Sequence, residues 1–194
     1  RCRFLNAPAD DLSALADASV DVVTTRSVLI YVAAKDRAFR EFHRVLRTGG
    51  RLSIFEPINR FAFPEPEHLF FGYDVTAVTD LARKVRAVYL RLQPPESDPM
   101  LNFDERDLLA GAQGAGFAEL RLELEAEIGS RQPREWGNFV ATAGNPRIPT
   151  LQEAMRQALT PDEAARFEAH LRPLVERGEG TKRMAVAYLR ATKR

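Results

Sequence analysis

Apolar positions in the first third of the chain follow two different spacings. Residues 2–7 and 20–25 are short, mostly apolar runs, which predict two strands, the second covered on both faces. From Lys35 the apolar positions recur at helical spacing until Gly49-Gly50, which predicts a helix closed by glycine. Residues 51–56 again read as a strand. This order of strand, helix, glycines and strand predicts a parallel βαβ unit with a right-handed crossover.

The remaining chain combines helical periods with one strictly alternating stretch. Apolar residues from Val75 to Leu92 mark a long helix, and Asp104 is placed as the N-cap of the next helix. Charged and apolar side chains alternate along residues 119–128, which predicts a strand with one solvated face. Thr150 and Thr160 each precede a glutamate by three positions, so they predict capping boxes. Residues 183–192 are apolar on both faces, which predicts an interior strand.

Composition narrows the class of protein. The chain has 194 residues, of which 45% are hydrophobic and 28% charged, as in a globular protein of one ordinary domain. A net charge of +1 gives no reason to expect a nucleic-acid partner. The single cysteine, Cys2, excludes an internal disulfide, and we expect it to be buried as a small apolar residue.

Neither a metal site nor a membrane segment is indicated by the sequence. The three histidines are widely spaced and show no metal-ligand pattern. The sequence contains no apolar run of membrane-spanning length and no signal-peptide pattern at its start. We therefore expect a reduced, cytoplasmic protein with no membrane partner.

Polar residues follow each of the predicted strands in the first part of the chain. They lie at Pro8–Leu12, at Thr25–Ser27 and at Glu56-Pro57. Ligands of parallel α/β sheets bind at the carboxyl ends of the strands, so these are the candidate site segments.

The same segments carry a resemblance to a known family. "APADDL", "SVDVVTTRS" and "VLRTGGRLSIFEP" occur in the order and at the gaps typical of class I S-adenosylmethionine-dependent methyltransferases of type 11. The match runs from about Phe4 to Pro57 and resembles the second half of their core. "GFAELRLELE" and the terminal "MAVAYLRATK" are similar to the antiparallel strand pair that closes such sheets, in which the last strand inserts inside its predecessor.

The resemblance implies an α/β fold, a partial Rossmann-like methyltransferase sheet that is mostly parallel with a C-terminal antiparallel strand pair. It implies S-adenosylmethionine as the cofactor. The turn after the first predicted strand would pass the adenine, and the end of the next strand would face the methionine portion. The implied cofactor-binding residues are Pro8, Ala9, Asp10, Thr25, Arg26 and Ser27.

The chain departs from the family pattern at several positions. Pro8 stands where the family has an adenine-contacting aspartate, and proline offers a carbonyl acceptor but no N–H donor. Val20 replaces the usual phenylalanine, and Thr48 replaces the usual proline. The sequence also lacks the strand that runs into D-x-G-x-G-x-G and the following strand with an acidic end. We therefore expect the chain to be the C-terminal portion of a longer natural protein.

A second glycine cluster does not replace that loop. "GAQGAGF" follows a predicted helix and precedes a predicted strand, whereas a cofactor loop follows a strand and precedes a helix. We interpret it as a helix stop.

We expect residues 1–194 to form a single methyltransferase-like domain with two insertions: a lid or substrate-recognition segment at 57–103 and a helical segment at 133–180. Aromatic residues are dense in the first insertion, so they could line a substrate pocket; alternatively, they cover the core beneath the long helix. Arg26 could bind an anionic group or be a surface residue at a strand end. The candidate substrate-pocket residues are Tyr31, Glu56, His68, Phe71 and Tyr73.

The function implied is transfer of a methyl group from S-adenosylmethionine to a small-molecule acceptor that is partly apolar or aromatic. The sulfonium supplies the activation and the protein mainly aligns the reactants, so we assign no catalytic residue. One alternative is a non-catalytic or degenerate partner subunit that does not bind cofactor alone. Another is a nicotinamide-dependent oxidoreductase, which shares the general sheet but not the closing antiparallel pair. The sequence does not indicate an oligomeric state.

Overall fold

The computed structural model describes residues 2–194, which group into two compact units. The first unit comprises the residues up to Phe61, Asp98–Ala126 and Met184–Arg194. The second comprises Ala62–Ser97 and Glu127–Arg183. Most of the two predicted insertions therefore packs into one unit with its own hydrophobic core.

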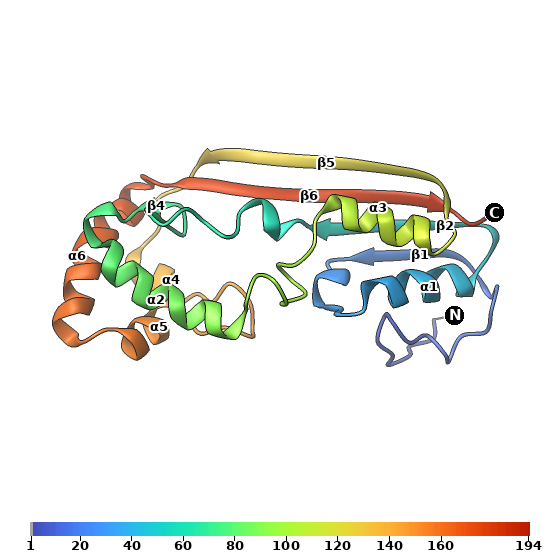
Figure 1. Cartoon of the computed structure of the whole chain (residues 1–194), viewed down its shortest axis with the longest axis horizontal. Helices are drawn as coiled ribbons and strands as arrows, with labels where there is room; N and C mark the ends of the chain where they lie inside the picture. Colours follow the sequence, from blue (N-terminus) through green and yellow to red (C-terminus); the bar gives the residue numbers. More distant parts are fainter. Residues whose placement is uncertain (1) are drawn as a thin grey trace. The chain divides into compact units, whose positions relative to one another are not determined.

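The first unit is built on a four-stranded sheet of mixed direction (Figure 1). β1 (Val20–Arg26) pairs in parallel with β2 (Leu46–Pro57), and β2 pairs antiparallel with β6 (Thr181–Thr192). The strand order is β1-β2-β6-β5, with β5 spanning Ala118–Ser130. The last strand thus lies inside its predecessor, and the predicted α/β fold class is confirmed.

Two helices complete the core of the first unit. α1 (Lys35–Val45) connects β1 to β2 and packs against α3 (Glu105–Gly114). Phe39 and Phe42, placed at helical spacing, are buried in one cluster with Leu52 and Ile54 of β2. Burying one such phenylalanine side chain stabilises the fold by roughly 2 kcal/mol. A Cβ at Gly111 of α3 would lie 2.5 Å from the Phe39 ring, so the close approach of the two helices requires glycine at this position.

The start and end of α3 agree with the sequence. The Asp104 side chain accepts hydrogen bonds from the backbone N–H groups of Arg106 and Asp107, and the Asp107 carboxylate accepts the N–H of Asp104. This reciprocal pair is a capping box. The helix ends at Gly114, and the chain enters β5 at Ala118, so "GAQGAGF" is a helix stop as predicted.

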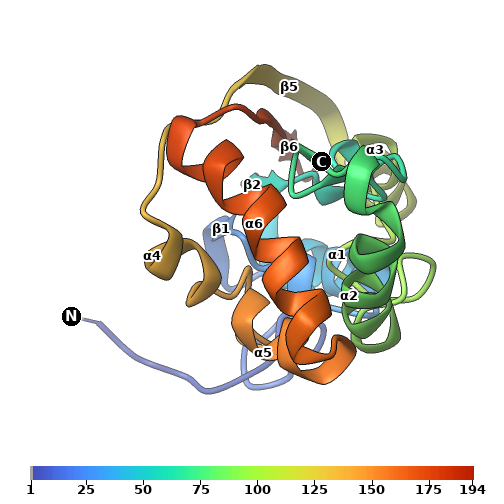
Figure 2. The same cartoon turned by 90° about the vertical axis from the view of Figure 1, so that its left-hand side faces the viewer.

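The second unit is mainly helical, and Figure 2 shows α6 alongside α2 and α5. It contains the helices α2 (Thr79–Leu92), α4 (Trp136–Val140), α5 (Leu151–Ala158) and α6 (Pro161–Arg177) and the strand pair β3 (Leu69–Phe70) and β4 (Tyr73–Asp74). The predicted capping boxes are confirmed: Thr150 with Glu153 begins α5, and Thr160 with Glu163 begins α6. α6 ends at Gly178, whose φ of +69° is the left-handed conformation that favours glycine.

Two predictions about the N-terminal segment are wrong. Residues 2–7 are exposed and form no strand, and Phe4 remains 94% exposed. A strand needs a neighbour for its backbone hydrogen bonds, and no strand of the sheet pairs with this segment. Cys2 is likewise exposed rather than buried, because it belongs to the same unpaired run.

Candidate functional site

The edge of the sheet where β1 and β2 both end is the centre of the candidate site. Because the two strands are parallel and Arg26 pairs with Phe55, their carboxyl ends lie side by side. The N–H of Ser27 donates to the Phe55 carbonyl at 2.8 Å, so the chain stays attached to β2 as it leaves β1. Ser27 has a φ of +52°, which costs a non-glycine residue about 1 kcal/mol. Such strain is often retained at ligand sites.

Thr25, the residue paired with Ile54 on β2, has an unsatisfied hydroxyl. The Oγ1 atom is buried, and within residues 2–194 it has no hydrogen-bond partner. Leaving a buried hydroxyl unpaired costs about 1–3 kcal/mol, so such groups are uncommon unless a ligand or water satisfies them. A threonine hydroxyl can both donate and accept, and it therefore suits either charge of a zwitterionic group.

Arg26 is an exposed cation at the same strand end. Its guanidinium lies 5.0 Å from the centre of the Phe55 ring, which in turn packs edge-on against Tyr188 at 5.2 Å. In the described part of the chain this guanidinium donates no hydrogen bond to protein, so its N–H groups remain open to a carboxylate or phosphate.

Glu56 holds the turn that follows β1. Its side chain is fully buried, with 0% of its surface exposed. Oε1 accepts the N–H groups of Val28 and Leu29, both at 2.9 Å, and Oε2 accepts the N–H of Ile30 at 3.2 Å. These donors belong to the short 3₁₀ turn at Leu29–Tyr31 and the residue before it. Both oxygens are thus engaged by backbone, which indicates a positioning residue; direct contact with substrate stays a prediction.

The electrostatic surroundings of Glu56 include the half-buried Lys35. Burial raises the pKa of Glu56, against the opposing effects of the three N–H groups and of the Lys35 charge. The Lys35 ammonium donates to the carbonyls of Val32 at 3.1 Å and Pro99 at 2.8 Å and lies 4.4 Å from the centre of the Phe103 ring. Burial lowers the pKa of Lys35. The sequence carries no signal for this role, because a lysine in a first helical turn is typical of an exposed position.

The predicted adenine turn lies in the first unit but is not joined to Thr25–Ser27. Pro8 is exposed, and Ala9 and Asp10 are half-buried, with Ala9 packed against the core. The Pro8 carbonyl accepts the N–H of Asp11 at 3.1 Å, which closes a turn. No hydrogen bond among residues 2–194 connects this turn to the end of β1. A shared role in cofactor binding stays a prediction.

Two residues of α1 hold the segment that follows this turn. The Glu41 carboxylate accepts the Leu12 N–H at 2.6 Å, and Arg44 donates to the Leu12 carbonyl at 2.9 Å. Arg44 also pairs with Glu41 at 2.8 Å, and its hydrogen bond lowers the pKa of Glu41. The sequence carries no signal for this role, because a glutamate and an arginine three positions apart on a helix are typical of an exposed face.

The predicted substrate residues fall in different units. Tyr31 and Glu56 belong to the first unit, and Tyr31 is 52% exposed. His68, Phe71 and Tyr73 belong to the second unit. His68 is exposed, and Phe71 is half-buried against Phe70 and Tyr89.

Tyr73 lies in the core of the second unit. It is 0% exposed, and its ring packs edge-on against Phe139 at 5.7 Å. Phe70 belongs to the same cluster, together with residues of α2. For these two aromatics the structure agrees with the alternative interpretation, in which they cover the core beneath the long helix.

Between residues 2 and 194 no group of three or more histidine, cysteine, aspartate or glutamate side chains is arranged to hold a metal ion. No helix in this range is both long and apolar enough to cross a membrane.

Comparison with known proteins finds a family model that matches the segment containing β1 and the residues Thr25–Ser27. Residues 1–54, which include β1, α1 and most of β2, match the family described as a methyltransferase domain. The human Thiol S-methyltransferase TMT1B is 35% identical over 107 residues, which cover 48% of this chain and 44% of that protein. The chain thus corresponds to less than half of the length of this relative.

The fold agrees with the sequence match. The crystal structure of a candidate methyltransferase from Bacillus halodurans C-125 superposes with a TM-score of 0.50 at 17% identity, covering 96% of this chain and 69% of that one. The resemblance to class I methyltransferases is therefore confirmed, in sequence over residues 1–54 and in the α/β fold.

Proposed function

We propose that this chain forms part of an S-adenosylmethionine site and that the activity it serves is methyl transfer to a small-molecule acceptor. The observation that carries the proposal is the buried, unpaired hydroxyl of Thr25 at the carboxyl end of β1. It lies within the segment that matches the methyltransferase domain family. The strained backbone at Ser27 and the open guanidinium of Arg26 support a ligand at the same place.

The residues at this strand end fit the methionine portion of the cofactor. When bound, S-adenosylmethionine supplies a methyl group activated by a sulfonium. Its amino-acid end carries an ammonium and a carboxylate. The Thr25 hydroxyl suits either group, and the Arg26 guanidinium suits the carboxylate. Glu56 would act at a distance, because its carboxylate fixes the turn that follows Ser27.

For the acceptor we propose a small, partly apolar molecule, with thiols as the first class to test. The human relative is named a thiol S-methyltransferase. A thiol is partly ionised near neutral pH and is intrinsically nucleophilic, so it can react without a side-chain base. This suits a strand end at which the buried acid, Glu56, is already engaged by backbone N–H groups.

Calorimetric titration of the full chain with S-adenosylhomocysteine tests the cofactor site. Thr25→Val keeps the side-chain shape and removes the hydroxyl, and we expect it to weaken binding about tenfold. Thr24→Val is the matched control, because Thr24 is the exposed neighbour on the same strand. Equal affinities for the two variants would exclude the role of Thr25.

A parallel titration with NADH separates the alternatives. Tighter binding of NADH than of S-adenosylhomocysteine would favour an oxidoreductase. Binding of neither would favour a non-catalytic partner subunit. If S-adenosylhomocysteine binds, turnover with a small alkyl thiol against the matching alcohol would test the acceptor class.

A further inference from the structure

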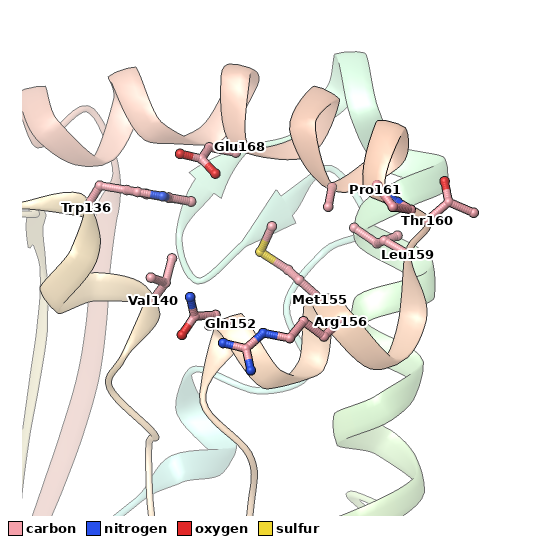
Figure 3. Close-up of a pocket in the computed structure, with 10 residues that line it drawn as sticks. Trp136, Val140, Gln152, Met155, Arg156, Leu159, Thr160, Pro161 and Glu168 are labelled. Atoms are coloured by element: carbon pink, nitrogen blue, oxygen red, sulfur yellow. The ribbon is translucent and has the colours of Figure 1, made fainter.

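The second unit contains a cavity of about 390 Å³ that the candidate methyltransferase site does not use (Figure 3). Its volume falls in the range of small-molecule pockets, roughly 300–1,000 Å³. Its walls come from α4, α5, α6 and the link between the last two. The lining residues are Trp136, Val140, Gln152, Met155, Arg156, Leu159, Thr160, Pro161, Ala164 and Glu168.

One part of the cavity is apolar and well shielded from solvent. Trp136, Val140 and Met155 are each only 7% exposed. In Figure 3 the indole of Trp136 and the side chain of Met155 extend toward one another from α4 and α5. A rigid indole beside a flexible thioether can enclose an apolar group of variable shape.

The other part of the cavity presents hydrogen-bond donors without acceptors. Gln152 and Arg156 lie one helical turn apart on α5 and both line the cavity, as Figure 3 shows. Both side chains are also exposed to solvent, and over residues 2–194 neither makes a hydrogen bond or ion pair with protein, nor does the Trp136 indole N–H have a protein acceptor. A carboxylate could accept hydrogen bonds from these donors.

The acidic groups near Arg156 are already engaged. Glu168, which also lines the cavity, pairs with Arg172 at 3.5 Å. Glu153 on α5 is close enough for the Arg156 charge to affect its pKa, but its carboxylate accepts the N–H of Thr150 at 2.8 Å as part of the capping box. The positive charge of Arg156 is therefore the one in the cavity wall that no direct ion pair within residues 2–194 offsets.

We propose that this cavity binds a small amphipathic carboxylate. The apolar body would lie between Trp136 and Met155, and the carboxylate would face Arg156 and Gln152. The proposal goes beyond the methyltransferase function and shares no residue with the candidate cofactor site.

Trp136 makes the test direct, because it is the single tryptophan of the chain and lines the cavity. The intrinsic fluorescence of the full chain would be titrated with octanoate, octan-1-ol and octylamine, which share the apolar chain and differ in charge. We expect a saturable change with octanoate and affinities about tenfold weaker for the other two. Arg156→Gln should weaken the binding of octanoate about tenfold and leave the affinity for octan-1-ol unchanged. Arg166→Gln is the control, because Arg166 is exposed on α6 and does not line the cavity.

Each other result would overturn the proposal. Equal affinity for the three probes would mean an apolar groove without anion recognition. Tighter binding of octylamine would assign the recognition to Glu168. No saturable response, in a protein whose far-ultraviolet circular dichroism is native, would exclude a binding site of this class.

Discussion

The turn after β1 and the first turns of α5 and α6 meet the same physical requirement in two ways. Each presents backbone N–H groups that have no partner inside the turn. In α5 and α6 a threonine and a glutamate three residues later satisfy them locally. After β1, the acceptor is Glu56, which lies 26 to 28 residues away in sequence.

The difference teaches which part of the molecule depends on tertiary structure. A local cap forms with its helix and needs no other element. The turn after β1 takes its shape only when β2 is paired beside it, because the carboxylate comes from β2. The candidate cofactor site is thus coupled to formation of the sheet, whereas the helix starts are not.

The two arrangements also differ in electrostatics. Backbone and side-chain hydrogen bonds from Thr150 lower the pKa of Glu153, and the hydrogen bond from Lys84 is the main cause that lowers the pKa of Glu163. Burial instead raises the pKa of Glu56. Because the pKa of Glu56 is shifted in the opposite direction to those of Glu153 and Glu163, their contributions to the stability of the fold should change in opposite directions as the pH falls.

Removing the long-range acceptor should have the largest effect on stability. Glu56→Leu leaves three N–H groups unpaired, two of them buried and that of Val28 partly buried, so we expect a loss of about 3–5 kcal/mol in the free energy of unfolding. Glu56→Gln keeps one acceptor oxygen and should lose about 1–2 kcal/mol. Urea unfolding measures both, with the exposed Glu125→Gln on β5 as the control. A Glu56→Leu variant as stable as this control would show that the Glu56 carboxylate does not hold the turn after β1.

The pH dependence sharpens the comparison. The folded pKa of Glu56 lies above its ordinary value of 4.5, so folding favours its protonated form. As the pH falls from above the folded pKa toward 4.5, wild type should therefore gain stability relative to Glu56→Gln. The contributions of Glu153 and Glu163 are present above 4.5 and are lost below it, as the pH falls through their lowered pKa values.

Unfolding free energies of wild type and Glu56→Gln, measured at intervals from neutral pH down to 4.5, test this expectation. Glu65, whose pKa is also raised by burial, is present in both proteins and cancels in the difference. A difference that does not change with pH would contradict it.

Removing a local cap should cost less. Thr160→Ala deletes the hydroxyl that accepts the Glu163 N–H at 3.3 Å, and we expect a loss of about 1 kcal/mol in the free energy of unfolding. Thr160→Asp restores an acceptor and should recover most of this loss. If Thr160→Ala proved as damaging as Glu56→Leu, the distinction between local and long-range solutions would fail.

The smallest effect is expected at the strained residue. Ser27→Gly relieves a left-handed φ of +52° and should stabilise the fold by up to about 1 kcal/mol, partly offset by the greater freedom of glycine in the unfolded chain. If the strain serves the cofactor site, the same variant should bind S-adenosylhomocysteine more weakly. A gain in both stability and affinity would contradict a functional reason for the strain.

Much of the fold could be predicted because its signals are local. The helical spacing of Phe39 and Phe42, the threonine caps and Gly178 each depend on residues within about one turn. The end of β1 could be singled out for the same reason, since Thr25, Arg26 and Ser27 follow an apolar run directly. The resemblance to the methyltransferase family then provided the order of the closing strands.

Tertiary structure decided the features whose partners are distant in the chain. An apolar run such as residues 2–7 becomes a strand only if a neighbour pairs with it, and none does. Tyr73 is a core residue because Phe139 packs against it, 66 positions further on. Glu56 holds the turn after β1 because the β1–β2 pairing brings its carboxylate within hydrogen-bond distance of three backbone N–H groups.

The sequence by itself thus determined the longer helices, most strands, the caps of α3, α5 and α6 and the location of one site segment. It did not predict α4, and it placed the end of α1 at Gly49-Gly50, whereas the helix ends at Val45 and both glycines lie inside β2. The physical reason is that propensity, periodicity and capping act between neighbouring residues. The packing of residues 62–97 with 127–183, the unpaired hydroxyl of Thr25 and the cavity beside Trp136 were decided only by the tertiary structure. Burial, pairing and cavity shape are properties of contacts between segments, and these exist only once the chain has folded.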